Sequence, residues 1–181
     1  MTSILQAQEF LRHAEMIRTP EEVQAAVAHV AREINGRLAD QHPLVLSVMG
    51  GAVIFTGQLL PQLNFPLDFD YLHVSRYGAK QKGGALHWKV SPGENVAGRV
   101  VLVLDDILDE GETLAAIRQR VLELGAAAFY SAVFADKANG LNKPIRADFT
   151  GMELPDRFVF GFGMDIQGAW RNLPAIYAVK K

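Results

Sequence analysis

The stretch VVLVLDDILDEGETL, residues 100–114, decides the fold that we predict for this chain. Its first five residues are apolar without interruption, which is typical of a strand buried on both faces. From Leu114 onward, apolar residues recur at helical spacing. Three carboxylates, Asp105, Asp106 and Asp109, therefore fall on a strand-to-helix turn. In an open α/β sheet such a turn lies beyond the carboxyl end of a strand, where ligands bind.

Two kinds of ligand suit a turn of this composition. Backbone amides at a helix N-terminus bind phosphate, and neighbouring carboxylates hold a hydrated Mg²⁺ or the hydroxyls of a sugar. An alternative is an acidic first turn that only complements the helix dipole, but the dipole does not require Asp105 and Asp106 at the strand end. The DDxxD metal motif of prenyl synthases is a further alternative. It belongs inside a long helix, whereas here a strand precedes the acidic pair and Gly111 follows it.

The composition indicates one globular domain over residues 1–181. Apolar residues make up 49% of the chain and charged residues 21%, which separates it from disordered chains. The net charge of −2 gives no support for a nucleic-acid partner, and no apolar run approaches the ~18 residues of a membrane span. The absence of cysteine excludes disulfides, zinc-thiolate sites and a cysteine nucleophile. We therefore expect a cytoplasmic protein with neither a nucleic-acid nor a membrane partner.

Helix and strand signals surround the acidic stretch. Thr19, Pro20 and Glu22 form a capping box that starts an amphipathic helix reaching about Asp40. Residues 49–51, Met-Gly-Gly, make a second strand-to-helix turn. Glycines there allow the backbone to approach a phosphate closely, with a simple tight turn as the alternative. Further strands are predicted at residues 44–48, 67–74, 85–90, 127–134 and 158–160, a helix at 52–60, and a last apolar piece at 175–179.

The acidic stretch resembles the diphosphate-sugar motif of the type I phosphoribosyltransferases. That motif is a hydrophobic strand, two acidic residues, two apolar residues, Asp, a small residue, Gly, any residue and Thr. A motif of this length is much more specific than a lone glycine-rich loop. Two other segments, PDRFVFGFGMD at residues 155–165 and RNLP at 171–174, resemble the purine-binding hood of the hypoxanthine-guanine branch. The resemblance covers roughly residues 44–179.

This resemblance implies an α/β fold with a twisted, mainly parallel sheet of five strands and flanking helices. It also implies a small hood, formed by the N-terminal segment and roughly residues 150–181. The implied activity moves the 5-phosphoribosyl group of phosphoribosyl pyrophosphate to hypoxanthine or guanine, with Mg²⁺ as cofactor, giving IMP or GMP and pyrophosphate. Because the family commonly forms dimers and tetramers, a homodimer or homotetramer is expected.

The resemblance further assigns residues to the sugar phosphate and the metal. Asp105 and Asp106 would hold the ribose hydroxyls, directly or through Mg²⁺, and Asp165 would serve a second Mg²⁺. Glu110 stands where the family usually has Thr or Ser, so its side chain and that of Glu112 are expected to point away from phosphate. The full set expected at ribose 5-phosphate is Asp105, Asp106, Asp109, Glu110, Gly111, Glu112 and Thr113.

Pyrophosphate binding is expected at a loop and at one arginine. The loop contains Met49 and Gly50 and resembles the pyrophosphate loop of the family, where Lys or Arg often stands at the position of Met49. The Val48–Met49 peptide is expected to be cis, as the corresponding peptide of the family often is. Arg171, from the RNLP segment, would also touch pyrophosphate.

Catalysis is expected to involve Asp109, Ser75 and Tyr77. Asp109 would face the purine and manage its proton as general base or acid. Ser75 and Tyr77 resemble the Ser-Tyr pair of the family's catalytic loop, although Arg76 stands where a small residue is usual. Residues 77–84 carry glycines and lysines between two strands, so we predict a mobile flap that closes over the reacting centre.

The purine is expected to meet four residues, and each has a plainer alternative or a second role. Lys137 would bond the oxygen at position six of the purine, although a lysine after a strand is usually solvated. Phe158 would stack on the base, with a core aromatic as the alternative. The backbone of Val159 would read the purine edge. Asp165, already assigned to the metal, completes this set.

Three functions remain open at this stage. The first is the enzyme, with a preference for hypoxanthine or guanine or, alternatively, for xanthine. The second is a regulator on the same fold, which binds phosphoribosyl pyrophosphate or a nucleotide without turnover. A lost acidic pair or a basic face would indicate such a regulator, whereas this chain keeps Asp105 and Asp106 and has a net charge of −2. The third is a non-enzymatic α/β binding module.

Overall fold

The strand that precedes the acidic turn lies inside a six-stranded sheet. The computed structural model describes residues 2–76 and 86–180 of the chain. The sheet has the order β4-β3-β2-β5-β6-β7, and β5 is Val100–Leu108. Five of its strands run parallel, and only β4 pairs antiparallel, with β3. The bounds of the other strands are β2 Leu44–Met49, β3 Asp68–Arg76, β4 Leu86–Val90, β6 Ala128–Ala138 and β7 Phe149–Pro155.

The prediction of a mainly parallel sheet is confirmed, but the number of five strands is wrong by one. The strand that the sequence did not reveal is β7, which pairs parallel with β6 at the edge of the sheet. Its sequence, FTGMELP, lacks a run of β-branched residues and contains Gly151 and Pro155. Glycine weakens a strand interior and proline is confined to strand ends and edges, so the local pattern does not indicate a strand. The hydrogen bonds and side-chain contacts of the ladder to β6 therefore stabilise this strand, although its local sequence does not favour one.

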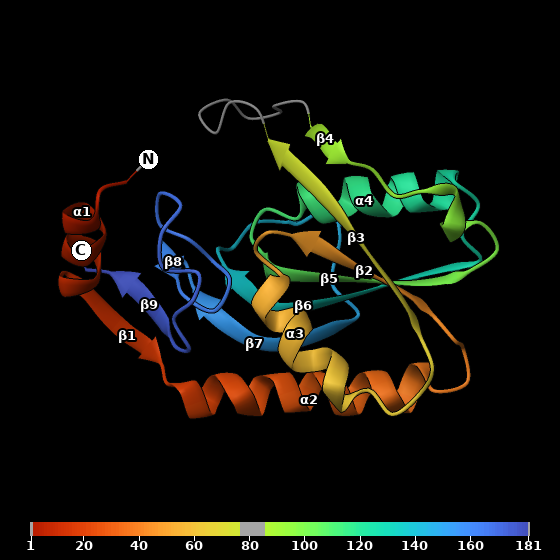
Figure 1. The fold of residues 1–181 in the computed structure, drawn as a ribbon, viewed down its shortest axis with the longest axis horizontal. Helices are drawn as coiled ribbons and strands as arrows, with labels where there is room; N and C mark the ends of the chain where they lie inside the picture. The colour runs from red at the N-terminus through yellow and green to blue at the C-terminus, as the bar shows by residue number, and fades with distance from the viewer. Residues whose placement is uncertain (1, 77–85, 181) are drawn as a thin grey trace.

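Helices cover both faces of this sheet, because alternate residues of β5 point to opposite sides. Leu102 and Leu104 belong to a core with α2, Pro20–Leu38, and α3, Val53–Leu59. Val101 and Val103 belong to a second core with α4, Glu112–Glu123. Figure 1 shows α2 and α4 on opposite sides of the sheet. Short 3-10 turns follow α3 at Leu60–Gln62 and precede β5 at Glu94–Val96.

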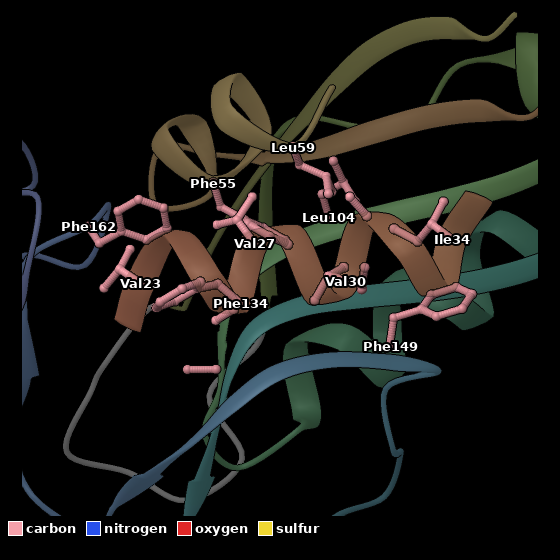
Figure 2. Packing of buried hydrophobic residues seen from close by; sticks show 14 of the residues in the cluster. Val23, Val27, Val30, Ile34, Phe55, Leu59, Leu104, Phe134, Phe149 and Phe162 are labelled. Carbon is pink, nitrogen blue, oxygen red and sulfur yellow. The ribbon is translucent and has the colours of Figure 1, made fainter. Parts of the chain in front are cut away.

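The predicted capping box starts α2 as expected. The Thr19 hydroxyl accepts a hydrogen bond from the Glu22 amide, and the Glu22 carboxylate accepts one from the Thr19 amide at 2.7 Å. In Figure 2, Val23, Val27, Val30 and Ile34 of α2 point into the core that α3 and the sheet close. Each such fully buried side chain stabilises the fold by roughly 1.5–3 kcal/mol. This packing holds α2 and α3 against one face of the sheet that carries the acidic turn. The side chains that meet α2 in this core include Phe55, Leu59, Leu104, Phe134, Phe149 and Phe162.

A second, small sheet joins the two ends of the described chain into the predicted hood. Its order is β1-β9-β8, with β1 Ala14–Arg18, β8 Val159–Phe160 and β9 Ile176–Val179. Helix α1, Ile4–Arg12, is tied to this sheet's loops, because the Trp170 indole donates to the Ala7 carbonyl at 2.5 Å. Figure 1 shows the hood beside the strand ends of the main sheet. The assignment of residues 1–181 to one domain stays a prediction.

Candidate active site

A cavity of about 460 Å³ lies at the carboxyl ends of β2, β3 and β5. Its position is the one predicted for an open α/β sheet. It brings the acidic turn together with the Met49 turn, the end of β3 and the hood. The residues that line it include Met49, Gly50, Gly51, His73, Ser75, Asp105, Asp106, Asp109, Glu110, Gly111, Thr113, Asp165 and Arg171.

Of the residues predicted for ribose 5-phosphate and pyrophosphate, one, Glu112, does not line this cavity. Glu112 is exposed at the start of α4 and does not line it, which agrees with the expectation that its side chain points away. Glu110, for which the same was expected, does line the cavity. Tyr77 and the predicted flap at residues 77–84 lie outside the described residues.

Asp105 of the acidic pair is buried, and Asp106 is partly buried. Asp105 is 8% exposed. Burial raises the pKa of Asp105 well above its usual range, and the neighbouring charge of Asp106 raises it further. Burial also raises the pKa of Asp106. The negative charges of two such adjacent carboxylates are unfavourable. A cation that binds both carboxylates, and a ligand as well, would offset this charge.

The donor set fits a divalent cation that also binds a ligand. Asp105 and Asp106 each use one carboxylate oxygen to accept a hydrogen bond, from the Asp106 amide at 3.0 Å and the Ile107 amide at 2.9 Å. Within residues 2–76 and 86–180, no group of three or more His, Asp or Glu side chains forms a complete metal site. Mg²⁺ usually keeps waters and substrate oxygens beside one or two carboxylates, so the pair suits a shared Mg²⁺ rather than a closed protein cage.

The Met49 turn packs directly against the acidic pair. A Cβ atom added at Gly51 would lie 1.9 Å from an Asp106 carboxylate oxygen. A Cβ atom added at Gly163 would lie 2.0 Å from the Gly51 carbonyl oxygen. Both positions favour glycine, because a side chain at residue 51 would displace the Asp106 carboxylate and one at residue 163 would displace the Gly51 carbonyl. The Met49 turn, the acidic pair and the hood meet at these two glycines.

The peptide bonds of this turn differ from the expectation. The cis peptide is Met49–Gly50, so the prediction of a cis Val48–Met49 peptide is wrong. Met49 is still in register with His73 in the ladder between β2 and β3, so the Val48–Met49 peptide belongs to the strand. The turn begins one residue later than the resemblance implied.

The start of α4 offers backbone amides to the cavity. Gly111 precedes the helix with φ of +84°, and no side chain caps the first turn. A residue with a Cβ rarely adopts this left-handed conformation, which explains the glycine. Helix N-termini without a capping side chain leave amide donors that suit an anion such as phosphate. Gly111 and Thr113 line the cavity at this end.

Asp109 is held by two side chains from the end of β6. The Lys137 ammonium donates to the Asp109 carboxylate at 2.7 Å, and the Lys137 side chain is only 13% exposed. Lys137 is therefore not the solvated lysine of the plainer alternative. The Asn139 amide donates to the Asp109 carboxylate at 3.1 Å and to the Asp109 carbonyl at 2.9 Å. Sequence reasoning missed Asn139, since an asparagine in a polar loop carries no specific signal.

A second cavity of about 220 Å³ adjoins the first, and all four residues predicted for the purine line it. The Phe158 side chain is 57% exposed, so it is available to stack on a base and is not a core aromatic. The two cavities share Ile107 and three acidic residues, Asp106, Asp109 and Asp165. The smaller one is lined by Asp106, Ile107, Asp109, Lys137, Phe158, Val159, Met164 and Asp165.

Arg171 and Asp165 form an ion pair at the hood side of the larger cavity. Their closest oxygen and nitrogen atoms are 2.5 Å apart. Arg171 also donates to the Gly163 carbonyl at 2.6 Å, and Asp165 accepts from the Gly168 amide at 2.6 Å. The residue predicted for pyrophosphate and the residue predicted for the second Mg²⁺ are thus paired with each other.

Comparison with known proteins agrees with this geometry. Residues 13–167 match the phosphoribosyl transferase domain family. The hypoxanthine-guanine phosphoribosyltransferase of Bacillus subtilis (strain 168) is 33% identical over 161 residues, which cover 88% of this chain and 89% of that protein. The protein of the same name from Aquifex aeolicus (strain VF5) is 32% identical over 162 residues, 88% of this chain and 91% of that protein.

A solved structure gives the same result. The hypoxanthine phosphoribosyltransferase of Staphylococcus aureus superposes with a TM-score of 0.87 at 25% identity, over 99% of this chain and 96% of that one. The chain belongs to the hypoxanthine-guanine phosphoribosyltransferase family. This confirms the predicted class, a phosphoribosyltransferase enzyme of purine salvage. None of the helices in the described ranges is long and apolar enough to cross a membrane.

Proposed function

We propose that this chain transfers the 5-phosphoribosyl group of phosphoribosyl pyrophosphate to hypoxanthine or guanine, giving IMP or GMP and pyrophosphate. The observation that carries the proposal is the pair of adjoining cavities, one acidic and one beside Phe158 and Lys137, which share Asp106, Asp109 and Asp165. A sugar phosphate in the first and a base in the second would place the anomeric carbon near Asp109. The reaction joins a base nitrogen to that carbon as the pyrophosphate oxygen leaves.

The larger cavity supplies the groups for the sugar. In our proposal, Asp105 and Asp106 orient the ribose hydroxyls, and the amides at the start of α4, with Thr113, hold the 5-phosphate. The amides at Met49 and Gly50, together with Arg171, contact the pyrophosphate. Bound Mg²⁺ would neutralise negative charge on the leaving pyrophosphate and on the acidic pair. Asp105 and Asp106, with Asp165, are the residues that would hold it.

The smaller cavity supplies the groups for the base. Phe158 stacks on the purine, and Lys137 donates to its oxygen at position six. The Val159 backbone contacts the purine edge. Asp109, already a hydrogen-bond acceptor for Lys137 at 2.7 Å, accepts the proton that the base nitrogen loses as the glycosidic bond forms. Ser75, at the end of β3, lines the larger cavity.

The test is nucleotide formation by the intact protein. Hypoxanthine, guanine, xanthine and adenine are each incubated with phosphoribosyl pyrophosphate and Mg²⁺, and the nucleotide and pyrophosphate are measured. The proposal expects turnover with hypoxanthine or guanine. Binding of phosphoribosyl pyrophosphate without product would identify a regulator, and turnover with xanthine above both would identify the xanthine-preferring alternative. If the protein neither bound phosphoribosyl pyrophosphate nor formed a nucleotide, the remaining alternative would be a non-enzymatic binding module.

Gly51→Ala should raise the KM for phosphoribosyl pyrophosphate. The added Cβ would lie 1.9 Å from the Asp106 carboxylate, so the carboxylate must move. Overpacking of this kind costs roughly 1–3 kcal/mol, which corresponds to about 5–150-fold if it falls on catalytic efficiency. Gly57→Ala is the matched control, because its added Cβ has no neighbour within 4 Å. An unchanged KM in Gly51→Ala would show that Asp106 does not need its present position.

The cytoplasmic location, expected from the composition, and the homodimer or homotetramer, expected from the family resemblance, also belong to this proposal. Sedimentation of the purified protein, with and without phosphoribosyl pyrophosphate, measures the assembly. A monomer at the concentrations used for the activity assay would contradict the oligomer while leaving the proposed reaction untouched.

A further inference from the structure

We propose that Lys143 is a positioning residue that sets the spacing of Asp109 and Lys137 and thereby fits the site to the purine. The inference rests on the proposed function. Lys143 lies in the polar loop after β6, for which the sequence indicated no role. Its side chain is 11% exposed, so it is buried to an extent that is rare for lysine.

The Lys143 ammonium has three donors and three partners. It donates to the Leu108 carbonyl at 2.8 Å and to the Lys137 carbonyl at 2.7 Å. Its third partner is the Asp136 carboxylate, with which it makes a short ion pair. A buried charge requires such complete pairing, because an unpaired ammonium away from water is strongly unfavourable. The pairing therefore fixes the ammonium between the ends of β5 and β6.

These partners lie where the two strands part. The β5–β6 ladder ends with Leu108 opposite Asp136. Asp109 and Lys137 are the next residues along the two strands, so their mutual distance is not set by that ladder. Lys143 bonds the carbonyl that precedes Asp109 and the carbonyl of Lys137 itself. Lys143 therefore connects the two strand ends beyond the last ladder pair. This is where Asp109, the proposed proton acceptor, and Lys137, the proposed partner of the base, are located.

The loop that carries Lys143 is fastened to the acidic turn at both ends. At its start, Asn139 donates to the Asp109 carbonyl and carboxylate. At its end, Gly111 packs so closely that an added Cβ would lie 3.2 Å from both Lys143 Cβ and Pro144 Cδ. The contact with Gly111, at the proposed 5-phosphate site, is made by Lys143 Cβ, which a methionine keeps. Loss of the Lys143 ammonium should therefore affect the base more than the sugar phosphate.

The variants compared are Lys143→Met, which keeps the length and removes the donors, and Lys143→Arg, which keeps a charge. Lys143→Met should raise the KM for hypoxanthine by about tenfold, the scale of one hydrogen bond to a charged group, and change the hypoxanthine-to-adenine ratio of kcat/KM. The KM for phosphoribosyl pyrophosphate should stay within about twofold of the wild-type value. Lys143→Arg should recover most of the loss.

If Lys143 only stabilised the fold, its replacement would lower the fraction of active protein. Both KM values and the hypoxanthine-to-adenine ratio of kcat/KM of the active fraction would stay unchanged. That result would overturn the proposal. If Lys143→Met fails to fold because Asp136 is left unpaired, Asp136→Asn with Lys143→Met removes both charges and should show the same rise in base KM. Wild-type protein without turnover on any purine would instead refute the proposed function, so the two failures are distinguishable.

Discussion

Asp105→Asn combined with Asp106→Asn should nearly abolish turnover while the fold survives. The two carboxylates are the acidic pair of the larger cavity, and in our proposal they hold the ribose hydroxyls and Mg²⁺. Removing one preorganised electrostatic contact at a reacting centre typically costs about 10²–10³-fold in rate, so the double change should cost at least that much. Initial rates at saturating and limiting phosphoribosyl pyrophosphate, at several Mg²⁺ concentrations, provide the measurement.

The same variant should be more stable than the wild-type protein in metal-free buffer at neutral pH. Burial raises the pKa of both carboxyls above the unfolded value of about 3.9, so the folded chain binds more protons than the unfolded chain between that value and the raised pKa values. The wild-type protein therefore loses stability as the pH rises through this window, and the loss is complete above it. The double variant lacks these titrating groups and should lose less stability over the same change.

Thermal unfolding with a chelator, at mildly acidic and at neutral pH, tests whether the wild-type protein loses more stability than the double variant as the pH rises. Asp40→Asn with Glu94→Gln is the matched control, because it removes two exposed carboxylates that do not line the cavity. The control should retain the wild-type turnover and the wild-type pH dependence. Near-normal turnover in Asp105→Asn with Asp106→Asn would refute the assignment of the acidic pair.

Lys137→Gln should narrow the preference for 6-oxopurines over adenine. Hypoxanthine and guanine present a carbonyl oxygen at position six, whereas adenine presents an amino group. Lysine has donors only, so it bonds the carbonyl and opposes the amino group. A buried donor without a partner costs roughly 1–3 kcal/mol, which corresponds to about a 10–100-fold preference. A glutamine amide also offers an acceptor, so adenine should lose less than hypoxanthine.

The structure adds a second consequence for this variant. Lys137 is the ion-pair partner of Asp109 at 2.7 Å, and its replacement leaves Asp109 with Asn139 as its remaining side-chain partner among the described residues. We therefore expect kcat on hypoxanthine to fall as well. Catalytic efficiency on hypoxanthine, guanine and adenine is compared with that of Lys180→Gln, an exposed control. An unchanged hypoxanthine-to-adenine ratio would show that Lys137 does not read the base.

The amino-acid sequence by itself determined the elements that depend on local patterns. The apolar run before Asp105 and the helical spacing after Leu114 specify a strand, a turn and a helix, because burial on two faces and on one face produce different periods. Thr19 and Glu22 likewise specify the start of α2, since both partners of the capping box lie within one turn. The placement of the acidic turn at the ligand-binding edge of the sheet follows from these elements and from the resemblance.

Only the tertiary structure decided which distant side chains meet. Lys137 and Asp109 are 28 residues apart, and their ion pair exists because β5 and β6 are parallel neighbours in the sheet. Strand β7 forms because β6 offers it a ladder, although its own sequence favours no strand. The close approach of Gly51 to Asp106 depends on how three loops pack together. Periodicity encodes which face of an element is buried, whereas contacts between loops depend on the sheet order, which no local pattern records.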